Sequence, residues 1–328
     1  MNLFQSYLSG RTQAVRVGHS FSDFNSIDLG VPQGSVLGPI LYLIYVNEAP
    51  TISEVFSTCL FCDDTTLIFE NKNIDTLIQV STAGLHEFYN WSSANRLSIN
   101  SSKTSYMCFS NSSNVSDLPN LELNGVPNER RSSVLFLGVT IDENLKFDLH
   151  INNIVTKISK NIGILYKLRQ YLPISVLKSI YYSFINSYLS YCPVVFGNAF
   201  DTHLKPLEIA QRKCIRVISN ELPRAHAEPI FSRLKILKFR DIYKLNLGII
   251  MYKNLDMFLQ SRSSHRYGTR SGNNRFNPQF QRLSLTQNQS VMYQAPNNWN
   301  TIPESIKEAP SVEVFKKPYK QHLFGCYC

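Results

Sequence analysis

The spacing of apolar and polar residues changes near residue 145. Before that point, residues 12–18 and 26–31 alternate in polarity, which predicts two short strands around a polar turn at 22–25. The turn-rich loop Gly30-Val31-Pro32-Gln33-Gly34 follows, and the apolar run 36–46 after it predicts a helix. Pro39 lies near the start of that helix, where a missing N–H is tolerated.

The next segments continue a mixed α and β pattern. Two β-type runs, 55–62 and 65–69, are separated only by Asp63-Asp64, which predicts a tight hairpin. Apolar residues recur at helical spacing over 74–95, and further strands are predicted at 105–109, 121–123 and 134–141. The predicted fold class is therefore α+β for residues 1–145.

After residue 145 the pattern is helical alone. Residues 151–168 keep the three-and-four spacing of an amphipathic helix, and further helices are predicted at 174–190, 203–219 and 238–254 with prolines between them. We expect a helical region over 146–258, a flexible basic linker over 259–290, and a small C-terminal tail over 291–328 with one helix near 312–323.

Charge divides the chain in the same way. Its net charge is +9, but residues 1–150 carry −7 and residues 151–328 carry +16, which indicates a polyanionic partner for the second part. The most apolar run is too short to span a membrane, and the N-terminus has no signal-peptide pattern. We therefore expect an intracellular protein, nuclear or cytoplasmic and not secreted, whose cysteines are free thiols.

Asp63 and Asp64 are the sharpest chemical feature of the sequence. Adjacent carboxylates between apolar strands repel each other unless a cation lies between them, and hard oxygen ligands suit Mg²⁺ or Mn²⁺. The dipeptide alone favours an ordinary exposed acidic turn, so the surrounding segments have to decide between the two.

The surrounding segments resemble the reverse transcriptase of non-LTR (LINE-type) retrotransposons, most closely the Jockey and CR1 groups. The resemblance is carried by SYLSGRTQ at 6–13, GVPQGSVLGPILYLIYVNEAP at 30–50, LFCDDTTLIF at 60–69, WSSANRLSINSSKTSYMCF at 91–109 and FLGVTID at 136–142. YGTRS at 267–271 and WNTIPESIKEAPSVEVFKK at 299–317 resemble the end of the same reading frames.

The resemblance implies a right-hand polymerase palm, with an antiparallel sheet and helices, followed by an all-helical thumb and C-terminal region. It implies two-metal nucleotidyl transfer with dNTPs, an RNA template and a DNA primer or target. Asp63 and Asp64 match the metal-binding acids, with Cys62 where the family usually has Ala, and Lys103 matches a lysine near the leaving pyrophosphate. The residues that match nucleotide binding are Pro32, Gln33, Gly34 and Ser35, and those that match primer support are Phe136, Leu137 and Gly138.

Each of these assignments has a plainer alternative in the residues themselves. The loop at 30–38 also fits an ordinary turn into a helix, Lys103 fits a solvated lysine at a strand edge, and residues 136–141 fit a core strand.

The family pattern also includes an earlier strand with a further catalytic Asp, in a segment of the form F-x-D, and fingers before it. Neither occurs in this chain, so we expect a palm remnant that has an unpaired sheet edge and is inactive by itself.

Basic residues of the second part are expected to follow the backbone of an RNA:DNA duplex. The residues predicted for this contact are Lys157, Lys160, Arg212, Lys213, Arg216, Arg266 and Arg270. An aromatic stripe could stack bases, although helical spacing favours core packing for it. The stripe consists of Tyr181, Tyr182, Phe184, Tyr188 and Tyr191.

Three functional hypotheses stay open from the sequence. The first is a reverse transcriptase fragment, an RNA-directed DNA polymerase by resemblance that lacks an essential catalytic segment. The second is a non-catalytic RNA- or DNA-binding remnant of the same element. The third is a decayed gene copy with no stable fold.

Overall fold

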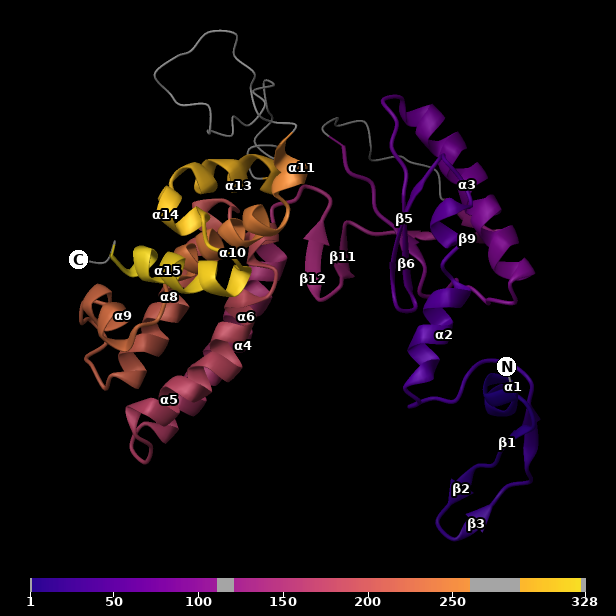
Figure 1. The fold of residues 1–328 in the computed structure, drawn as a ribbon, viewed down its shortest axis with the longest axis horizontal. Coiled ribbons are helices and arrows are strands. Elements are labelled where there is room, and N and C mark those ends of the chain that lie inside the picture. Colours follow the sequence, from indigo (N-terminus) through magenta and orange to yellow (C-terminus); the bar gives the residue numbers. More distant parts are fainter. Residues whose placement is uncertain (1, 111–120, 260–289, 326–328) are drawn as a thin grey trace. The chain divides into compact units, whose positions relative to one another are not determined.

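A computed structural model of the protein describes residues 2–110, 121–259 and 290–325. These residues form two compact units (Figure 1). Unit 1 contains residues 2–106 and 121–131, and unit 2 contains residues 107–110, 132–259 and 290–325. The predicted linker at 259–290 lies almost wholly outside the described residues.

Unit 1 begins with helix α1 (Asn2–Leu8) and a ribbon of four short strands. Strand β1 (Arg11–Gln13) pairs antiparallel with β4 (Asn25–Ile27), and β2 (Arg16–Val17) pairs with β3 (Ser20–Phe21). The chain therefore reverses at Gly18 and His19, so the predicted turn at 22–25 is wrong. Gly18 has φ +63°, a conformation that glycine adopts without a steric penalty.

The middle of unit 1 follows the prediction closely. It contains helix α2 (Leu37–Tyr45), the 3₁₀ turn Ala49–Thr51, strands β5 (Ser57–Phe61) and β6 (Asp64–Ile68), and helix α3 (Ile74–Ala94). Helix α3 starts at Asn73, whose side chain accepts hydrogen bonds from the backbone N–H of Asp75 at 2.8 Å and of Thr76 at 3.1 Å.

Unit 1 has a small core around an aromatic cluster. The rings of Phe56, Phe69 and Phe88 lie near one another, with centroid separations of 5.4 Å and 6.5 Å from Phe56 to the other two. Gly84 of α3 faces this cluster, and a Cβ there would lie 2.6 Å from the ring of Phe69. Glycine therefore lets α3 approach the aromatic side chains.

Short strand pairs complete unit 1. Strands β8 (Glu122–Leu123) and β9 (Val126–Pro127) pair antiparallel, whereas β7 (Ser105–Tyr106) and β10 (Glu129–Arg130) pair in parallel. Every sheet in the described part of the chain has two strands. The mixed α and β prediction is thus confirmed as helices with small, mostly antiparallel sheets.

Unit 2 begins with a hairpin where a single strand over 134–141 was predicted. Strands β11 (Ser133–Phe136) and β12 (Val139–Asp142) pair antiparallel across a two-residue turn. The turn residues Leu137 and Gly138 have φ +45° and +82°, positive at both central positions as a type I′ hairpin requires.

Helices form the rest of unit 2 in the described part of the chain. They are α4 (Asp148–Leu168), α5 (Ile174–Tyr181), the π-helical turn Tyr182–Asn186, α6 (Ser187–Ser190), α7 (Pro193–Phe196), α8 (Asp201–Ile218), α9 (Glu228–Leu234), α10 (Phe239–Lys253), α11 (Leu255–Leu259), α13 (Val291–Asn300), α14 (Glu304–Lys307) and α15 (Val312–Gly325). The predicted helix 174–190 is therefore interrupted. Asn161 of α4 donates from Nδ2 to the carbonyl oxygen of Phe184 in the π-helical turn at 2.7 Å.

One continuous hydrophobic core holds the helices of unit 2 together. Helix α4 packs on α8, and α10 packs on both α13 and α15. The Phe315 ring of α15 lies against the rings of Tyr252, Tyr319 and Trp299, with centroid separations of 4.9, 5.4 and 5.7 Å. The C-terminal segment, expected as a small tail, thus shares its core with the helices that precede residue 258.

Candidate functional site

The carboxylate pair lies at the end of the β5–β6 hairpin of unit 1. The register pairs Phe61 with Asp64, so the two turn residues are Cys62 and Asp63, and Asp64 is the first residue of β6. The predicted turn at Asp63-Asp64 is thus displaced by one residue. Cys62 has φ +53°, which is uncommon for a residue other than glycine.

Both carboxylates are exposed to solvent. No hydrogen bond or ion pair joins the side chain of Asp63 or Asp64 to another described residue. The described residues contain no group of three or more His, Cys, Asp or Glu side chains that could hold a metal ion. The hairpin therefore presents two hard oxygen donors, which can supply part of a Mg²⁺ or Mn²⁺ ligand set and would need water or substrate oxygens to complete it.

Helix α2 lies beside the tip of this hairpin. Burial raises the pKa of the Tyr42 hydroxyl, and the nearby charges of Asp63 and Cys62 raise that pKa further. The structure thus brings α2 close to one of the two predicted metal ligands.

The loop before α2 is held by Arg11 and Ser35. Arg11 donates from Nη2 to the carbonyl oxygens of Gly30 at 2.7 Å and Leu29 at 3.2 Å. The Ser35 hydroxyl oxygen accepts from the backbone N–H of Gly38 at 3.0 Å and from the Tyr7 hydroxyl. Ser35, predicted to bind nucleotide, is therefore engaged in capping the start of α2.

The other predicted nucleotide-binding residues of the loop before α2 leave open space around them. Gly34 has φ +80°, and a Cβ at this position would meet no atom within 4 Å. Gln33 is exposed and Pro32 is half-buried. A backbone bend with an exposed amide side chain beside it leaves room for a ligand at Gln33 and Gly34.

Lys103 lies in an exposed turn just before β7. The turn is organised by Asn100, whose carbonyl oxygen accepts from the backbone N–H of Lys103 at 3.1 Å and from the Thr104 hydroxyl at 2.9 Å. The lysine side chain is exposed.

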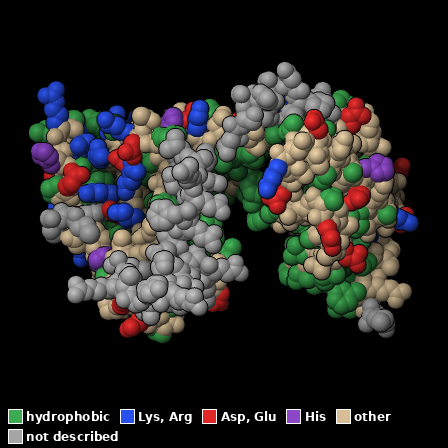
Figure 2. All heavy atoms as spheres, turned by 90° about the horizontal axis from the view of Figure 1, so that it is seen from above, with side chains coloured by type: hydrophobic (Ala, Val, Ile, Leu, Met, Phe, Trp, Pro, Cys, Tyr) green, Lys and Arg blue, Asp and Glu red, His purple; other side chains and the backbone are tan. Residues whose placement is uncertain are grey.

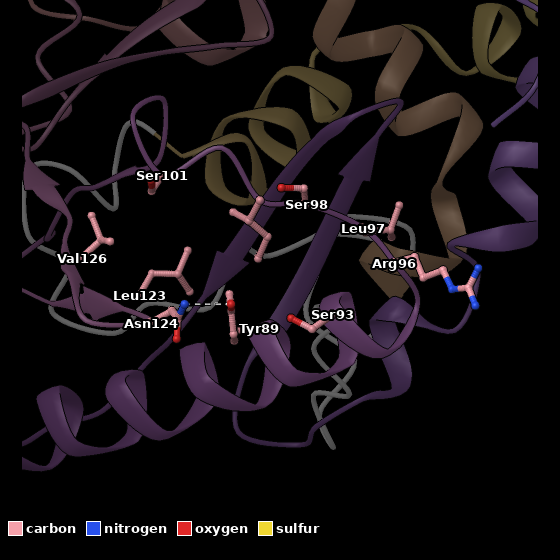
Figure 3. A pocket seen from close by; sticks show the side chains of 10 residues that line it. Tyr89, Ser93, Arg96, Leu97, Ser98, Ser101, Leu123, Asn124 and Val126 are labelled. Carbon is pink, nitrogen blue, oxygen red and sulfur yellow. Dashed lines mark hydrogen bonds between the residues drawn. The ribbon is translucent and has the colours of Figure 1, made fainter. Parts of the chain in front are cut away.

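A hollow of about 470 Å³ adjoins this turn (Figure 3). Tyr89 and Asn124 face each other across it, joined by a 2.8 Å hydrogen bond from the Asn124 amide to the Tyr89 hydroxyl. Arg96 contributes to the lining, but its guanidinium points away from the Tyr89–Asn124 pair in Figure 3. Neither aspartate of the hairpin and no residue of the 30–35 loop lines this hollow.

The predicted primer-support residues form the β11–β12 turn of unit 2. The Tyr191 hydroxyl donates to the carbonyl oxygen of Leu137 at 2.5 Å. A Cβ at Gly138 would lie 3.3 Å from the Tyr191 ring, so a larger residue would crowd this contact. Tyr191, which the sequence placed in a stacking or core stripe, thus anchors the turn.

Two further polar residues lie near the start of α4: Asp142 is the last residue of β12, and His150 lies in the first turn of the helix. Asp142 is buried and accepts from the backbone N–H of Asn144, Lys146 and Phe147 at 3.1, 3.0 and 2.7 Å. His150 is also buried, and its Nδ1 accepts from the backbone N–H of Thr140 at 3.2 Å. Asp142 ends the FLGVTID segment, and its position at a strand end before a helix is the only sequence signal for this role.

The basic candidates differ in their surroundings. Lys157 and Lys160 are exposed on α4, and the Lys157 ammonium lies 5.4 Å from the centroid of the Tyr188 ring. On α8, Arg212 forms an ion pair with Glu208 at 3.3 Å, and Arg216 donates to the carbonyl oxygen of Ala225 at 2.7 Å. Lys213 is exposed, while Arg266 and Arg270 lie outside the described residues.

The aromatic stripe is divided between core and surface. Tyr181 is fully buried, and Tyr188 is partly buried against the core. Phe184, Tyr191 and Tyr182 are 56%, 50% and 37% exposed. Core packing therefore explains only part of the stripe.

Comparison with known proteins finds a family match and several relatives. The family described as reverse transcriptase (RNA-dependent DNA polymerase) matches residues 3–141. The chain is 31% identical over 252 residues to an RNA-directed DNA polymerase from mobile element jockey of Drosophila melanogaster, covering 72% of this chain and 27% of that protein. It is 30% identical over 224 residues to a probable RNA-directed DNA polymerase from transposon X-element of the same species, covering 66% and 24%.

A more distant relative is a retrovirus-related Pol polyprotein from type-1 retrotransposable element R1 of Bradysia coprophila, 26% identical over 165 residues and covering 50% of this chain and 16% of the relative. The chain spans about a quarter of the length of the first two relatives. No solved structure matches it. Among the described residues, none of the helices combines the length and the apolar character needed to cross a bilayer.

Proposed function

We propose that this chain, which contains a reverse transcriptase domain homologous to the RNA-directed DNA polymerases of non-LTR retrotransposons, supplies the catalytic hairpin and a nucleic-acid-binding helical region of such a polymerase. Its substrates would be an RNA template, a DNA primer or target, and dNTPs. The observation that carries the proposal is the exposed pair Asp63 and Asp64 at the end of a β-hairpin within the matched residues 3–141.

Asp63 and Asp64 would hold Mg²⁺ or Mn²⁺. When bound, such ions lower the pKa of a primer 3′-hydroxyl and neutralise the charge of a triphosphate and its leaving pyrophosphate. The chain itself contributes orientation, because the two-residue turn at Cys62 and Asp63 fixes the position of Asp63. Lys103 is the candidate to deliver a proton to the leaving group.

The loop before α2 would form the nucleotide-binding surface. Arg11 fixes the backbone at Gly30, and Ser35 fixes the start of α2, so the bend at Gly34 is held from both sides. Because the Ser35 hydroxyl is already hydrogen-bonded within the protein, we assign the direct contact with the nucleotide to the exposed Gln33 amide and the Gly34 backbone. Pro32 stiffens the backbone at this surface. Phe136, Leu137 and Gly138 are proposed to support the primer end.

In this proposal unit 1 corresponds to the palm and the helices of unit 2 to the thumb and C-terminal region. Two carboxylates leave a two-metal site incomplete, so we expect the chain to be inactive by itself. A second candidate, nucleic-acid binding without catalysis, is favoured by the net charge of +16 on residues 151–328.

Paramagnetic broadening by Mn²⁺ tests the metal site directly. In amide NMR spectra of the full chain, we expect Mn²⁺ to broaden the signals of residues 61–65, and the double variant Asp63→Asn/Asp64→Asn to lose this effect. Asp23→Asn/Asp28→Asn, which removes two exposed acids of the same unit, is the matched control and should keep it. Broadening that persists in Asp63→Asn/Asp64→Asn would remove the catalytic assignment.

Primer extension tests the chemistry. With Mg²⁺, dNTPs and a DNA primer on an RNA template, we expect no product from this chain alone. Extension that disappears in Asp63→Asn would show instead that the chain is catalytically complete, and would contradict the expected inactivity.

A further inference from the structure

The segment SYLSGRTQ at 6–13 contains no residue of the proposed catalytic hairpin or nucleotide-binding loop. It covers the end of α1 and the strand β1. Two of its side chains, Tyr7 and Arg11, hydrogen-bond to residues of the loop before α2, which lie 18 to 28 positions further along the chain. The segment is therefore next to the candidate nucleotide-binding loop in space, although it is distant from it in sequence.

Arg11 holds the first residues of that loop. Its Nη2 donates to the carbonyl oxygens of Gly30 at 2.7 Å and Leu29 at 3.2 Å, and its Nε donates to the carbonyl oxygen of Leu8 at 3.0 Å. Leu8 is the last residue of α1, so one guanidinium ties the end of this helix to the start of the loop. Three of its five N–H donors are thus directed to backbone carbonyl oxygens.

Tyr7 holds the other end of the loop. Its hydroxyl donates to the Ser35 hydroxyl oxygen, which also accepts from the backbone N–H of Gly38 at 3.0 Å. The side chains at both anchors are half-buried, whereas Gln33 and Gly34 between them are exposed. The loop is therefore fastened at both ends and open in the middle.

The middle of the loop needs such support. Gly30 and Gly34 have φ +73° and +80°, and glycine has more conformations open to it than other residues when the chain is not held. The backbone hydrogen bond within the loop, from the N–H of Ser35 to the carbonyl oxygen of Pro32, is long at 3.4 Å. A loop that is already in its binding conformation loses less entropy when a ligand arrives, so external anchors raise affinity.

We propose that Tyr7 and Arg11 are positioning residues, which hold the loop 29–35 in the bend that receives the nucleotide before the nucleotide binds. This inference rests on the proposed function and adds the residues that preorganise the contact assigned to Gln33 and Gly34. The two side chains act as a pair, because each fastens one end of the same loop. Neither touches the nucleotide in this arrangement.

A direct contact of Arg11 with nucleotide phosphates is the alternative. Residues 1–131 contain seven Lys and Arg against twelve Asp and Glu, so a phosphate near this loop would find few cations. Figure 2 likewise shows few blue side chains on unit 1 from its viewpoint, and more on unit 2. The two roles differ for Arg11→Lys, because lysine keeps the positive charge but lacks the planar fork that reaches three carbonyl oxygens.

The nucleotide affinity of the full chain tests the two roles. Fluorescence anisotropy of dye-labelled dGTP with Mn²⁺ should show that Arg11→Lys and Tyr7→Phe each weaken binding about three- to tenfold, because each variant loses anchoring hydrogen bonds. Arg16→Lys and Tyr45→Phe make the same chemical changes at exposed positions of unit 1 and should change affinity less than about twofold. Wild-type affinity in Arg11→Lys would assign the guanidinium to a phosphate contact, and wild-type affinity in Tyr7→Phe would remove the second anchor. Either result would overturn the proposal.

Amide NMR spectra of the nucleotide-free chain test the conformation of the loop itself. Without either anchor the loop should sample more conformations, so the signals of Val31, Gln33 and Gly34 should shift and broaden in Arg11→Lys and in Tyr7→Phe. The signals of α3 should stay unchanged, which would show that unit 1 is still folded in both variants. Loop signals identical to those of the wild type would contradict the positioning role.

The double variant Tyr7→Phe/Arg11→Lys measures whether the two anchors act together. Once one end of the loop is free, loss of the other anchor should matter less, so the combined loss of affinity should be smaller than the product of the two single losses. A combined loss equal to that product would mean that the two side chains act independently and would contradict their pairing. Absence of dGTP binding by the wild-type chain would contradict the proposed function itself, whereas wild-type binding that both single variants retain would contradict only this inference.

Discussion

The two units differ in how much apolar surface each buries by itself. In unit 2 a single core extends from β12 and α4 to α15, and Ile158, Leu204 and Phe315 are completely buried in it. In unit 1 the buried apolar residues of the described part are Val46, Ala49, Phe56, Phe88 and Leu123. Unit 2 therefore has the interior of an ordinary helical domain, and unit 1 does not.

Helix α2 shows what this difference means. Ile40, Leu43 and Ile44 are 52%, 57% and 67% exposed, although nearly every residue of the helix is apolar. A nine-residue helix is marginal in water without packing of its apolar face. Packing within unit 1 therefore contributes little to the stability of α2.

The largest expected difference between the two units is in the rate of amide hydrogen exchange, measured in the full chain. Amides of α8 and α10 are expected to exchange only through global unfolding, and amides of α2 and of the β5–β6 hairpin at least about a hundredfold faster through local opening. Mass spectrometry of peptides from the two units measures this directly. Equal protection in α2 and α8 would remove the contrast between the units.

A buried amide in unit 2 gives the next largest effect. Gln211 donates from Nε2 to the Tyr181 hydroxyl and to the carbonyl oxygen of Leu237, both at 2.9 Å, and its Oε1 accepts from the backbone N–H of Phe239 at 2.9 Å. Gln211→Ala leaves these groups unpaired in the core, so we expect it to lower the free energy of unfolding by about 3 kcal/mol.

Urea titration measures that loss, with the exposed Gln321→Ala of α15 as the matched control, expected to change the free energy by less than about 0.5 kcal/mol. A loss of similar size in both variants would mean that the hydrogen bonds of Gln211 do not hold α5, α8 and α10 together.

The pH dependence of unit 2 should be the smallest of these effects. Burial lowers the pKa of His150, and the charge of Lys157 lowers it further. The folded state therefore binds fewer protons than the unfolded state below the unfolded pKa of about 6.5, so this contribution to stability is present above that pH and is lost as the pH falls.

His150→Phe should flatten the decline of the melting temperature between pH 7 and pH 5. It should also lower the melting temperature at neutral pH, because the Thr140 N–H loses its acceptor. An unchanged slope would assign the acid sensitivity to other groups.

The sequence predicts the helices of the fold well where one helix face is buried and the opposite face is exposed, because apolar residues then recur at helical spacing. The spacing over 151–168 and 74–95 gives α4 and α3 nearly to the residue. The π-helical turn and the β11–β12 turn were missed because Leu137 and Phe184 carry no turn signal, and tertiary contacts from Tyr191 and Asn161 hold them. Pro206 lies inside α8, where its missing N–H removes one hydrogen bond of the helix, yet the helix continues through it.

The positions of the two acidic residues of the candidate site could be predicted from the sequence, whereas the side chains that hold the neighbouring backbone in place could not. Asp63 and Asp64 stand at the hairpin end as the sequence indicates, because two β-type runs with two polar residues between them have few other arrangements. The engagement of Ser35 with Gly38 and the burial of Asp142 depend on which backbone N–H groups the fold leaves unpaired. Such groups are defined only once the chain is folded.

The π-helical turn after α5 has one consequence for how this segment can vary. A ring closed by five peptide units instead of four contains one surplus residue, and Tyr181 before it, Ile185 within it and Leu189 after it all stay in the core. Deleting a single residue from 182–186 would convert the bulge to regular helix while the buried stripe keeps its alignment. At this turn the chain can therefore lose one residue without rotating the helix that follows.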